Sequence, residues 1–157
     1  MESLLAITNL LYAYGERVDA GDFAGIGDLL ADARVSDESG RLDIRGADAV
    51  RRLYEATTRR YPDTGTPKTK HVITNPIVEI DEVEGRAACR SHYTVFQQTD
   101  VLPLQPIIAG RYQHTFERRD GAWRITGHRF FVDLIGDVSQ HLLVPLGNRD
   151  GADRGTS

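Results

Sequence analysis

The sequence has few of the residues that build disulfides, secretory leaders and membrane spans. Its only cysteine, Cys89, cannot form an internal disulfide, which fits a reducing compartment, so we expect a cytoplasmic protein. Cys89 follows two alanines in a strand-like run, where cysteine commonly behaves as a small buried hydrophobe and not as a nucleophile. No basic N-terminal segment leads into an apolar run, and no apolar stretch approaches the roughly 20 residues that cross a bilayer. We therefore expect no membrane partner.

The sequence also lacks an excess of positive charge. Lysine and arginine number 19 against 23 aspartates and glutamates, for a formal net charge of -4. Phosphate binding needs a concentrated basic surface. The arginine pairs at 51–52 and 59–60 instead share a predicted helix with Asp48 and Glu55, as on a solvated face. We therefore expect no nucleic-acid partner.

Patterns for metals, phosphates and covalent catalysis are missing as well. Four histidines are spaced without a His-x-His, H-x-x-x-H or clustered carboxylate pattern: His92, His114, His128 and His141. No Gly-rich phosphate loop and no G-x-S-x-G turn occur. We expect no metal and no cofactor. The chemistry open to such a chain is proton transfer and elimination.

Helical periodicity is present in the first part of the chain. Apolar residues recur at steps of three and four over 2–20, which predicts a helix with one apolar stripe: Leu4, Ile7, Leu11, Tyr14 and Val18. Gly21 is placed to end that helix and Asp22 to cap a second one over 23–30. A third helix is predicted over 46–61.

From residue 71 the period changes from helical to two, which predicts four long strands. Their ranges are 71–80, 86–97, 107–118 and 122–133, after two short strand candidates at 33–35 and 42–44. Asp120-Gly121, between alternating apolar residues, predicts a tight hairpin turn. Helices followed by an antiparallel meander indicate an α+β fold, and 157 residues suit one domain.

Several segments, in this order, carry a resemblance to a known family. They are Leu10 to Tyr14, Val18 to Phe23, Lys70 to Asn75, Gly110 to Tyr112 and Arg119 to Ile125. Over roughly residues 3–135 the chain resembles the SnoaL-like branch of the NTF2-like, ketosteroid isomerase-like superfamily. The resemblance implies a cone in which a strongly curved antiparallel sheet wraps the N-terminal helix and leaves an apolar pocket, in a domain spanning 1–135.

The resemblance also implies chemistry at four positions. Scytalone dehydratase, lindane dehydrochlorinase and bile-acid 7α-dehydratase share an Asp at the end of the first helix and a His on the first long strand, which match Asp19 and His71. The bile-acid enzyme pattern adds a Tyr and an Arg, which match Tyr14 and Arg129. An imidazole can take a proton from carbon near neutral pH, and a carboxylate on its other nitrogen orients it.

Structural roles compete with the catalytic ones at each position. His71 can be an ordinary strand histidine beside a helix-end aspartate, and the ring of Tyr14 fits core packing. Arg129 shares strand parity with Trp123 and Phe131 on the side expected to face inward, where it can form an ion pair instead. These alternatives stay open at the level of sequence.

The expected pocket wall comes from three of the predicted strands. Tyr112 shares parity with His114 and Phe116. The residues expected to line the pocket are Tyr112, Trp123, Val95 and Phe131. Scytalone dehydratase has a second His at a position that matches Val95 or Phe96 here, and neither of these can activate water. A scytalone-type substrate is therefore not expected.

Two functions follow from these patterns. The first is a cofactor-independent, dehydratase-like lyase or isomerase in which His71 abstracts a proton from a small, apolar, cyclic molecule while Asp19 orients it. The second is a non-catalytic binding module, or an assembly protein resembling the β subunit of ring-hydroxylating dioxygenases. The resemblance implies a homo-oligomer, a trimer before a dimer. We expect 136–147 to cover the pocket or a partner, and 148–157 to be a disordered tail.

Overall fold

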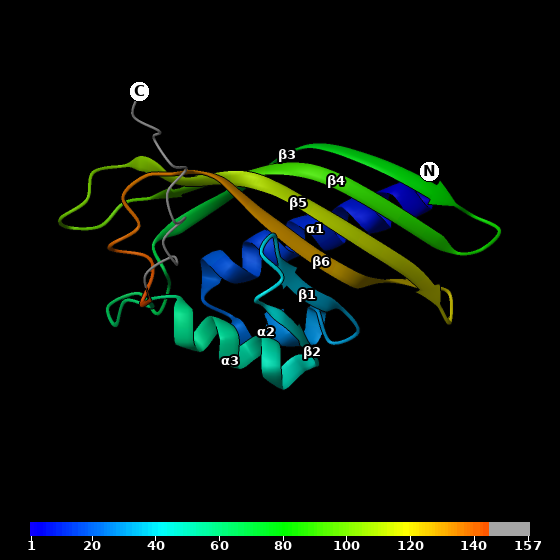
Figure 1. The fold of residues 1–157 in the computed structure, drawn as a ribbon, viewed down its shortest axis with the longest axis horizontal. Coiled ribbons are helices and arrows are strands. Elements are labelled where there is room, and N and C mark those ends of the chain that lie inside the picture. The colour runs from blue at the N-terminus through cyan, green and yellow to red at the C-terminus, as the bar shows by residue number, and fades with distance from the viewer. Residues whose placement is uncertain (145–157) are drawn as a thin grey trace, which may run out of the picture.

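The computed structural model describes residues 1–144, in which three helices pack on one side of a six-stranded sheet (Figure 1). The helices are α1 (Glu2–Ala20), α2 (Phe23–Leu29) and α3 (Ala47–Thr57). The strands are β1 (Arg34–Asp37), β2 (Asp43–Arg45), β3 (Thr69–Asp81), β4 (Arg86–Gln97), β5 (Gln105–Arg119) and β6 (Ala122–Ile135). The strand order is β2-β1-β6-β5-β4-β3, so the four long strands form an antiparallel meander. The predicted α+β fold is confirmed.

Helix α1 fills the concave side of the sheet with the apolar stripe that the sequence predicted. Ile7, Leu11, Tyr14 and Val18 are buried, whereas Leu4 is 46% exposed and lies outside the core. Gly21 ends the helix with a left-handed φ of 70°, and the carboxylate of Asp22 caps α2 by accepting a hydrogen bond from a backbone N–H. The last turn of α1 lies against the start of β3, where Asp19 contacts Thr69 and His71.

Helix α3 ends at Thr57, four residues before the predicted end at Tyr61. The chain turns to an extended conformation at Thr58, which forms an isolated bridge with Leu142. The backbone N–H of Arg59 donates to the carbonyl of His141 at 2.8 Å. Pairing with the distant C-terminal segment therefore replaces the last helical turn, and a local helical pattern cannot report it.

The C-terminal segment returns across the molecule after β6 and reaches the end of α3 (Figure 1). Its position is described as far as residue 144. Residues 145–147 of the predicted covering segment, and the predicted tail 148–157, lie outside the described residues.

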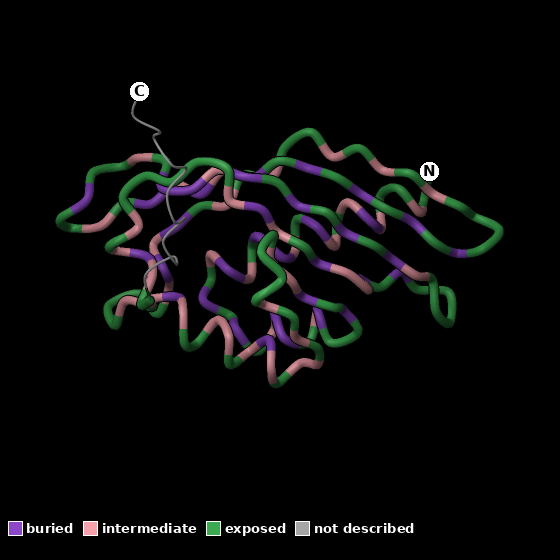
Figure 2. Tube along the Cα trace, in the orientation of Figure 1, coloured by how far each residue is buried: buried purple, intermediate pink, exposed green. Residues whose placement is uncertain are grey.

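The strands alternate buried and exposed residues as the two-residue period requires, most regularly in β4 (Figure 2). Asp120 and Gly121 have φ of 51° and 80° and make the predicted tight turn between β5 and β6. The short strand β1 pairs in parallel with β6, a pairing between segments that lie about ninety residues apart. That partner was not predicted, because nothing local in a four-residue strand specifies it.

A β-bulge in the β5–β6 pair changes which residues of β6 face the core. The register shifts between Thr115 and Phe116, so Trp123 and Ile125 are buried on one side of the bulge and His128 on the other. A side chain at Gly127 would place its Cβ 2.5 Å from the Thr115 hydroxyl, so glycine permits the bulge. The predicted inward parity of residues 123 to 131 is therefore wrong beyond Ile125.

Candidate active site

Asp19 and His71 meet where the last turn of α1 crosses the start of β3. The carboxylate Oδ1 of Asp19 lies 2.7 Å from the imidazole Nδ1 of His71, and their side chains are 11% and 6% exposed. Asp19 Oδ2 accepts the backbone N–H of His71 at 2.8 Å, and Oδ1 also accepts the Thr69 hydroxyl at 2.8 Å. The carboxylate is thus held at both oxygens by the strand that carries the histidine.

Gly15 lies where the helix packs closely on the strand. A Cβ at that position would lie 3.4 Å from the Cβ of His71 and 3.6 Å from Ile73. Residues 15 and 19 are one helical turn apart and face the same way. Both distances are ordinary van der Waals contacts, so the face of α1 that carries Asp19 packs directly on β3.

The electrostatics of the pair assign its tautomer. Burial alone would raise the pKa of Asp19, but the hydrogen bonds and positive charge of His71, with the hydrogen bond from Thr69, outweigh burial and lower it. The ionised carboxylate only accepts hydrogen bonds, so Nδ1 of His71 carries a proton. In the neutral ring, Nε2 is left with a free lone pair that can accept a proton.

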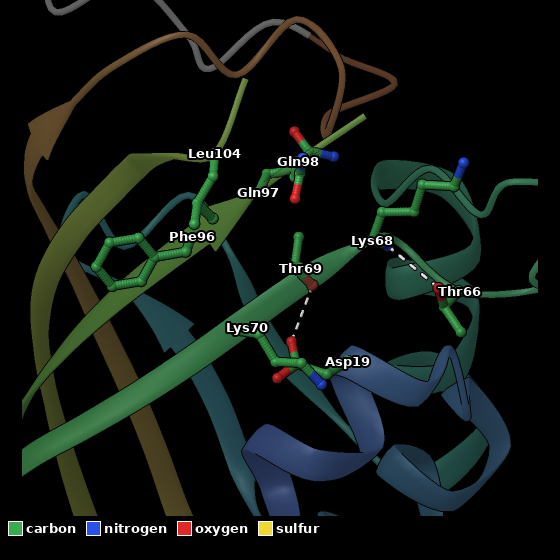
Figure 3. Close-up of a pocket in the computed structure, with 9 residues that line it drawn as sticks. All are labelled: Asp19, Thr66, Lys68, Thr69, Lys70, Phe96, Gln97, Gln98 and Leu104. Atoms are coloured by element: carbon green, nitrogen blue, oxygen red, sulfur yellow. Dashed lines mark hydrogen bonds between the residues drawn. The ribbon is translucent and has the colours of Figure 1, made fainter. Parts of the chain in front are cut away.

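A pocket of about 360 Å³ opens beside the pair, between the start of β3, the end of β4 and the loops around them (Figure 3). Asp19 and Thr69 form its floor, and Phe96 and Leu104 add apolar surface. The full lining is Asp19, Thr66, Lys68, Thr69, Lys70, Phe96, Gln97, Gln98 and Leu104. The pocket is thus mixed in character, and the ring of His71 is not part of its lining.

Tyr14 lies deeper in the cone than the Asp19–His71 pair. Its hydroxyl is 2.6 Å from the hydroxyl of Tyr54 on α3, and its ring packs edge-on against Tyr112. Burial, with the neighbouring Tyr112, raises the pKa of Tyr14, so its hydroxyl stays protonated. No hydrogen bond within residues 1–144 joins Tyr14 to Asp19 or His71.

Two of the four predicted pocket residues lie on the concave side near this centre. Val95 stands opposite His71 in the β3–β4 register and is 2% exposed. Tyr112 is 3% exposed and stacks on Tyr93 with ring centroids 4.2 Å apart. These residues belong to the buried cone interior and are not part of the described pocket lining.

The other two pocket predictions do not reach the pair. Trp123 is buried near the β5–β6 turn, at a level of the sheet that corresponds to Asp81 at the far end of β3. Ten strand residues separate that level from His71, a distance of about 30 Å. Phe131 lies on the outer face, where the guanidinium groups of Arg111 and Arg129 stand 4.6 and 5.0 Å from its ring centroid.

Arg129 is likewise on the outer face, because the bulge before it reverses the strand parity. It is exposed, and its guanidinium reaches the carbonyl of Glu38 at 3.5 Å. Asp133 pairs with Arg111 at 2.8 Å. The expectation that Arg129 faces into the cone is therefore wrong.

Two buried histidines occupy the inward positions instead. Nδ1 of His128 lies 2.8 Å from Nε2 of His114, and both side chains are almost fully buried among Tyr14, Tyr112 and Phe116. Burial lowers the pKa of His128 to about 4, and burial followed by the charge of His128 lowers that of His114. The sequence placed His114 on the same side of its strand as Tyr112, whereas the inward position of His128 was missed because it depends on the bulge.

His141 is a second residue that sequence reasoning missed. It lies in the C-terminal segment and is 5% exposed. Burial, followed by the charge of His71, lowers its pKa to about 4, although Asp19 acts in the opposite direction.

Within residues 1–144, no group of three or more His, Cys, Asp or Glu side chains is arranged to hold a metal ion. The helices of this part of the chain include none that is both long and apolar enough to cross a membrane.

The fold and the buried carboxylate–imidazole pair define a class, the cone-shaped α+β domains whose curved, open sheet wraps an N-terminal helix. A family model described as "SnoaL-like domain" matches residues 1–129. The chain therefore belongs to the SnoaL-like family, and the resemblance seen in the sequence is confirmed.

Solved structures at low sequence identity share the fold of this chain. An NTF2-like protein with a cystatin-like fold from Novosphingobium aromaticivorans is 20% identical, with a TM-score of 0.69 over 88% of this chain and 86% of that one. A putative scytalone dehydratase from the same organism is 21% identical, with a TM-score of 0.68 over 93% and 94%. ActVI-ORFA from Streptomyces coelicolor is 12% identical, with a TM-score of 0.67 over 85% and 98%. No curated protein matches the chain.

Proposed function

We propose that this protein is a cofactor-independent lyase or isomerase in which His71 removes a proton from carbon. The single observation that carries the proposal is the 2.7 Å contact between Asp19 Oδ1 and His71 Nδ1 in a nearly solvent-free setting. Asp19 holds the ring in the tautomer whose Nε2 is a base, and it stabilises the imidazolium that forms. Similarity of fold to a putative scytalone dehydratase is consistent with such chemistry.

The reaction needs no group beyond the side chains. Nε2 of His71 takes the proton of a C–H bond next to a carbonyl, and the electron pair of that bond moves onto the carbonyl oxygen. In isomerisation the imidazolium returns the proton to a different carbon. In dehydration the electrons expel a hydroxyl group, which leaves as water with the proton that His71 had taken.

The surroundings of the pair favour a small ligand that is apolar but carries an oxygen. Phe96 and Leu104 offer apolar surface in the pocket, and the ammonium group of Lys70 offers a hydrogen-bond donor. A small cyclic ketone fits this description.

We propose that the protein works as a homo-oligomer, with a trimer as the first expectation. Light scattering coupled to size-exclusion chromatography would measure the oligomeric state.

Deuterium exchange tests proton abstraction without knowledge of the natural substrate. Cyclic ketones such as β-tetralone are incubated with the protein in deuterium oxide, and NMR follows exchange at the carbon next to the carbonyl. We expect protein-dependent exchange that falls by about 100-fold or more in His71→Gln and less steeply in Asp19→Asn. His92→Gln is the matched control, because His92 is exposed on β4. Exchange in His71→Gln at the wild-type rate would contradict the proposal.

A non-catalytic binding module is the second candidate, and one observation favours it. The described pocket includes Asp19 in its lining but not the ring of His71. Under this function, ligands bind with equal affinity to the wild type and to His71→Gln, and no ketone exchanges its protons. The exchange experiment therefore separates the two functions.

A further inference from the structure

A second imidazole, that of His141, is built into the neighbourhood of the Asp19–His71 pair. It comes from the C-terminal segment, which lies beyond residues 1–129 matched by the family. The ring is 5% exposed, and its backbone is fixed on both sides. Its carbonyl accepts the N–H of Arg59 at 2.8 Å, and its N–H donates to the carbonyl of Val138 at 3.0 Å.

Hydrogen bonds tie this segment to the strand ends that hold Asp19. The side-chain amide of Gln97, 1% exposed, donates to the carbonyl of Gln140 at 3.1 Å, and the Tyr61 hydroxyl donates to the same carbonyl at 2.6 Å. Gln97 stands opposite Thr69 in the β3–β4 register, and the Thr69 hydroxyl bonds to Asp19. The residue before His141 is therefore anchored to the wall that carries the pair.

The imidazole of His141 is left without the partners that a structural role would supply. Its Nδ1 is inaccessible to solvent and has no hydrogen-bond partner among the described residues. A buried polar atom without a partner is costly and calls for an explanation. The charges of His71 and Asp19 both act on His141, which places it within electrostatic reach of them, and burial keeps it neutral at pH 7.

A neutral imidazole can act only as a hydrogen-bond donor or a weak base. Its single N–H can donate to an oxygen, and it does not add a positive charge that would compete with His71 for Asp19. Preorganised donors of this kind are effective where negative charge develops in a site with little water.

We propose that the N–H of His141 donates a hydrogen bond to the substrate oxygen that becomes negative when His71 removes the proton. No covalent bond to His141 forms or breaks in this step: the proton passes from carbon to His71 Nε2, and the electron pair passes to the oxygen held by His141. The inference rests on the proposed function and assigns to the same site the feature that recognises an enolate. It favours substrates with a carbonyl group next to the acidic carbon.

Binding of para-nitrophenolate tests the role of His141, because its ionised oxygen stands for the enolate oxygen. Absorbance reports the bound anion, and titration gives its dissociation constant for each variant. In His141→Leu, which keeps the bulk but removes the donor, we expect binding to weaken by about 10-fold or more. In His141→Gln, whose amide supplies an N–H, we expect most of the affinity to remain. His92→Gln is the control, and urea unfolding verifies that each variant is folded.

The outcomes separate this inference from the proposed function. Weaker binding in His141→Leu with recovery in His141→Gln supports the hydrogen bond. Equal binding in wild type and both variants, with ketone exchange still dependent on His71, refutes the role of His141 and leaves the proposed function standing. Absence of binding to the wild-type protein, together with absence of ketone exchange, overturns both. If His141→Leu does not fold, His141→Gln and His141→Asn are compared, and equal loss in both refutes the donor role.

Discussion

The buried histidines should make the protein lose stability when the pH falls from 7 to 5. Burial lowers the pKa of His128 and of His141 from the ordinary 6.5 to about 4 in the folded state. The unfolded chain binds more protons than the folded one between these two values, so stability is complete above pH 6.5 and decreases as the pH falls toward 4. His114, whose pKa is also lowered, adds in the same direction.

The size of the effect follows from the two values. At pH 5 an imidazole of pKa 6.5 in the unfolded chain is almost fully protonated, whereas one of pKa about 4 in the folded protein is mostly neutral. Relative to pH 7, each of His128 and His141 then costs about 2 kcal/mol, and the two together about 4 kcal/mol. That is a large part of the ~5–15 kcal/mol by which a domain of this kind is stable. Asp19 does not contribute in this window, because its pKa is lowered from 3.8 and its stabilisation is lost only below that pH.

Urea unfolding at pH 7, 6 and 5 measures this loss, and the single tryptophan, Trp123, reports it because it is 8% exposed in the folded protein. In His128→Gln we expect a lower stability at pH 7 but a smaller decrease toward pH 5, by about 2 kcal/mol. His92→Gln, at an exposed position, should keep the wild-type decrease. A free energy of unfolding that is constant from pH 7 to 5, or a His128→Gln variant with the full wild-type decrease, would refute the reasoning.

Two further predictions concern the interior of the cone, and urea unfolding at pH 7 measures both. Gly110→Ala should destabilise the protein by about 2 kcal/mol or more, because a Cβ there would lie 1.9 Å from the Phe131 carbonyl and 2.9 Å from the Tyr93 ring. The control is Ala88→Ser, at an exposed position on β4, which should change stability by less than about 0.5 kcal/mol. Tyr14→Phe should cost about 1–3 kcal/mol, because the hydroxyl of the half-buried Tyr54 loses its 2.6 Å partner. Tyr12→Phe, at a position 45% exposed, should be near neutral. Unchanged stability in either cone variant would contradict the packing described for it.

Much of the architecture could be predicted because its causes are local. The stripe from Ile7 to Val18 and the Gly21–Asp22 pair specify where α1 lies and ends. Asp120 and Gly121 specify a turn by their tolerance of positive φ. The approach of His71 to Asp19 came from resemblance and not from periodicity, since the two residues are fifty-two positions apart.

The features that the sequence did not predict correctly share a different cause, which is pairing between distant segments. The bulge at Thr115 depends on how β5 and β6 pair, and it decides that His128 faces inward while Arg129 and Phe131 face outward. The early end of α3 and the placement of His141 depend on a bridge between Thr58 and Leu142. No window of sequence around any of these residues contains its partner.

The sequence by itself determined most of the helices and strands and the α+β class, because backbone hydrogen bonding and apolar periodicity act over a few residues. The family followed from the resemblance of several segments to a known family. Only the tertiary structure decided which imidazoles and aromatic rings share the interior with Tyr14, because a one-residue change of strand register moves every later side chain to the opposite face. It also decided that the C-terminal segment that carries His141 is anchored to Gln97 and Tyr61, since these hydrogen bonds join segments far apart in the chain.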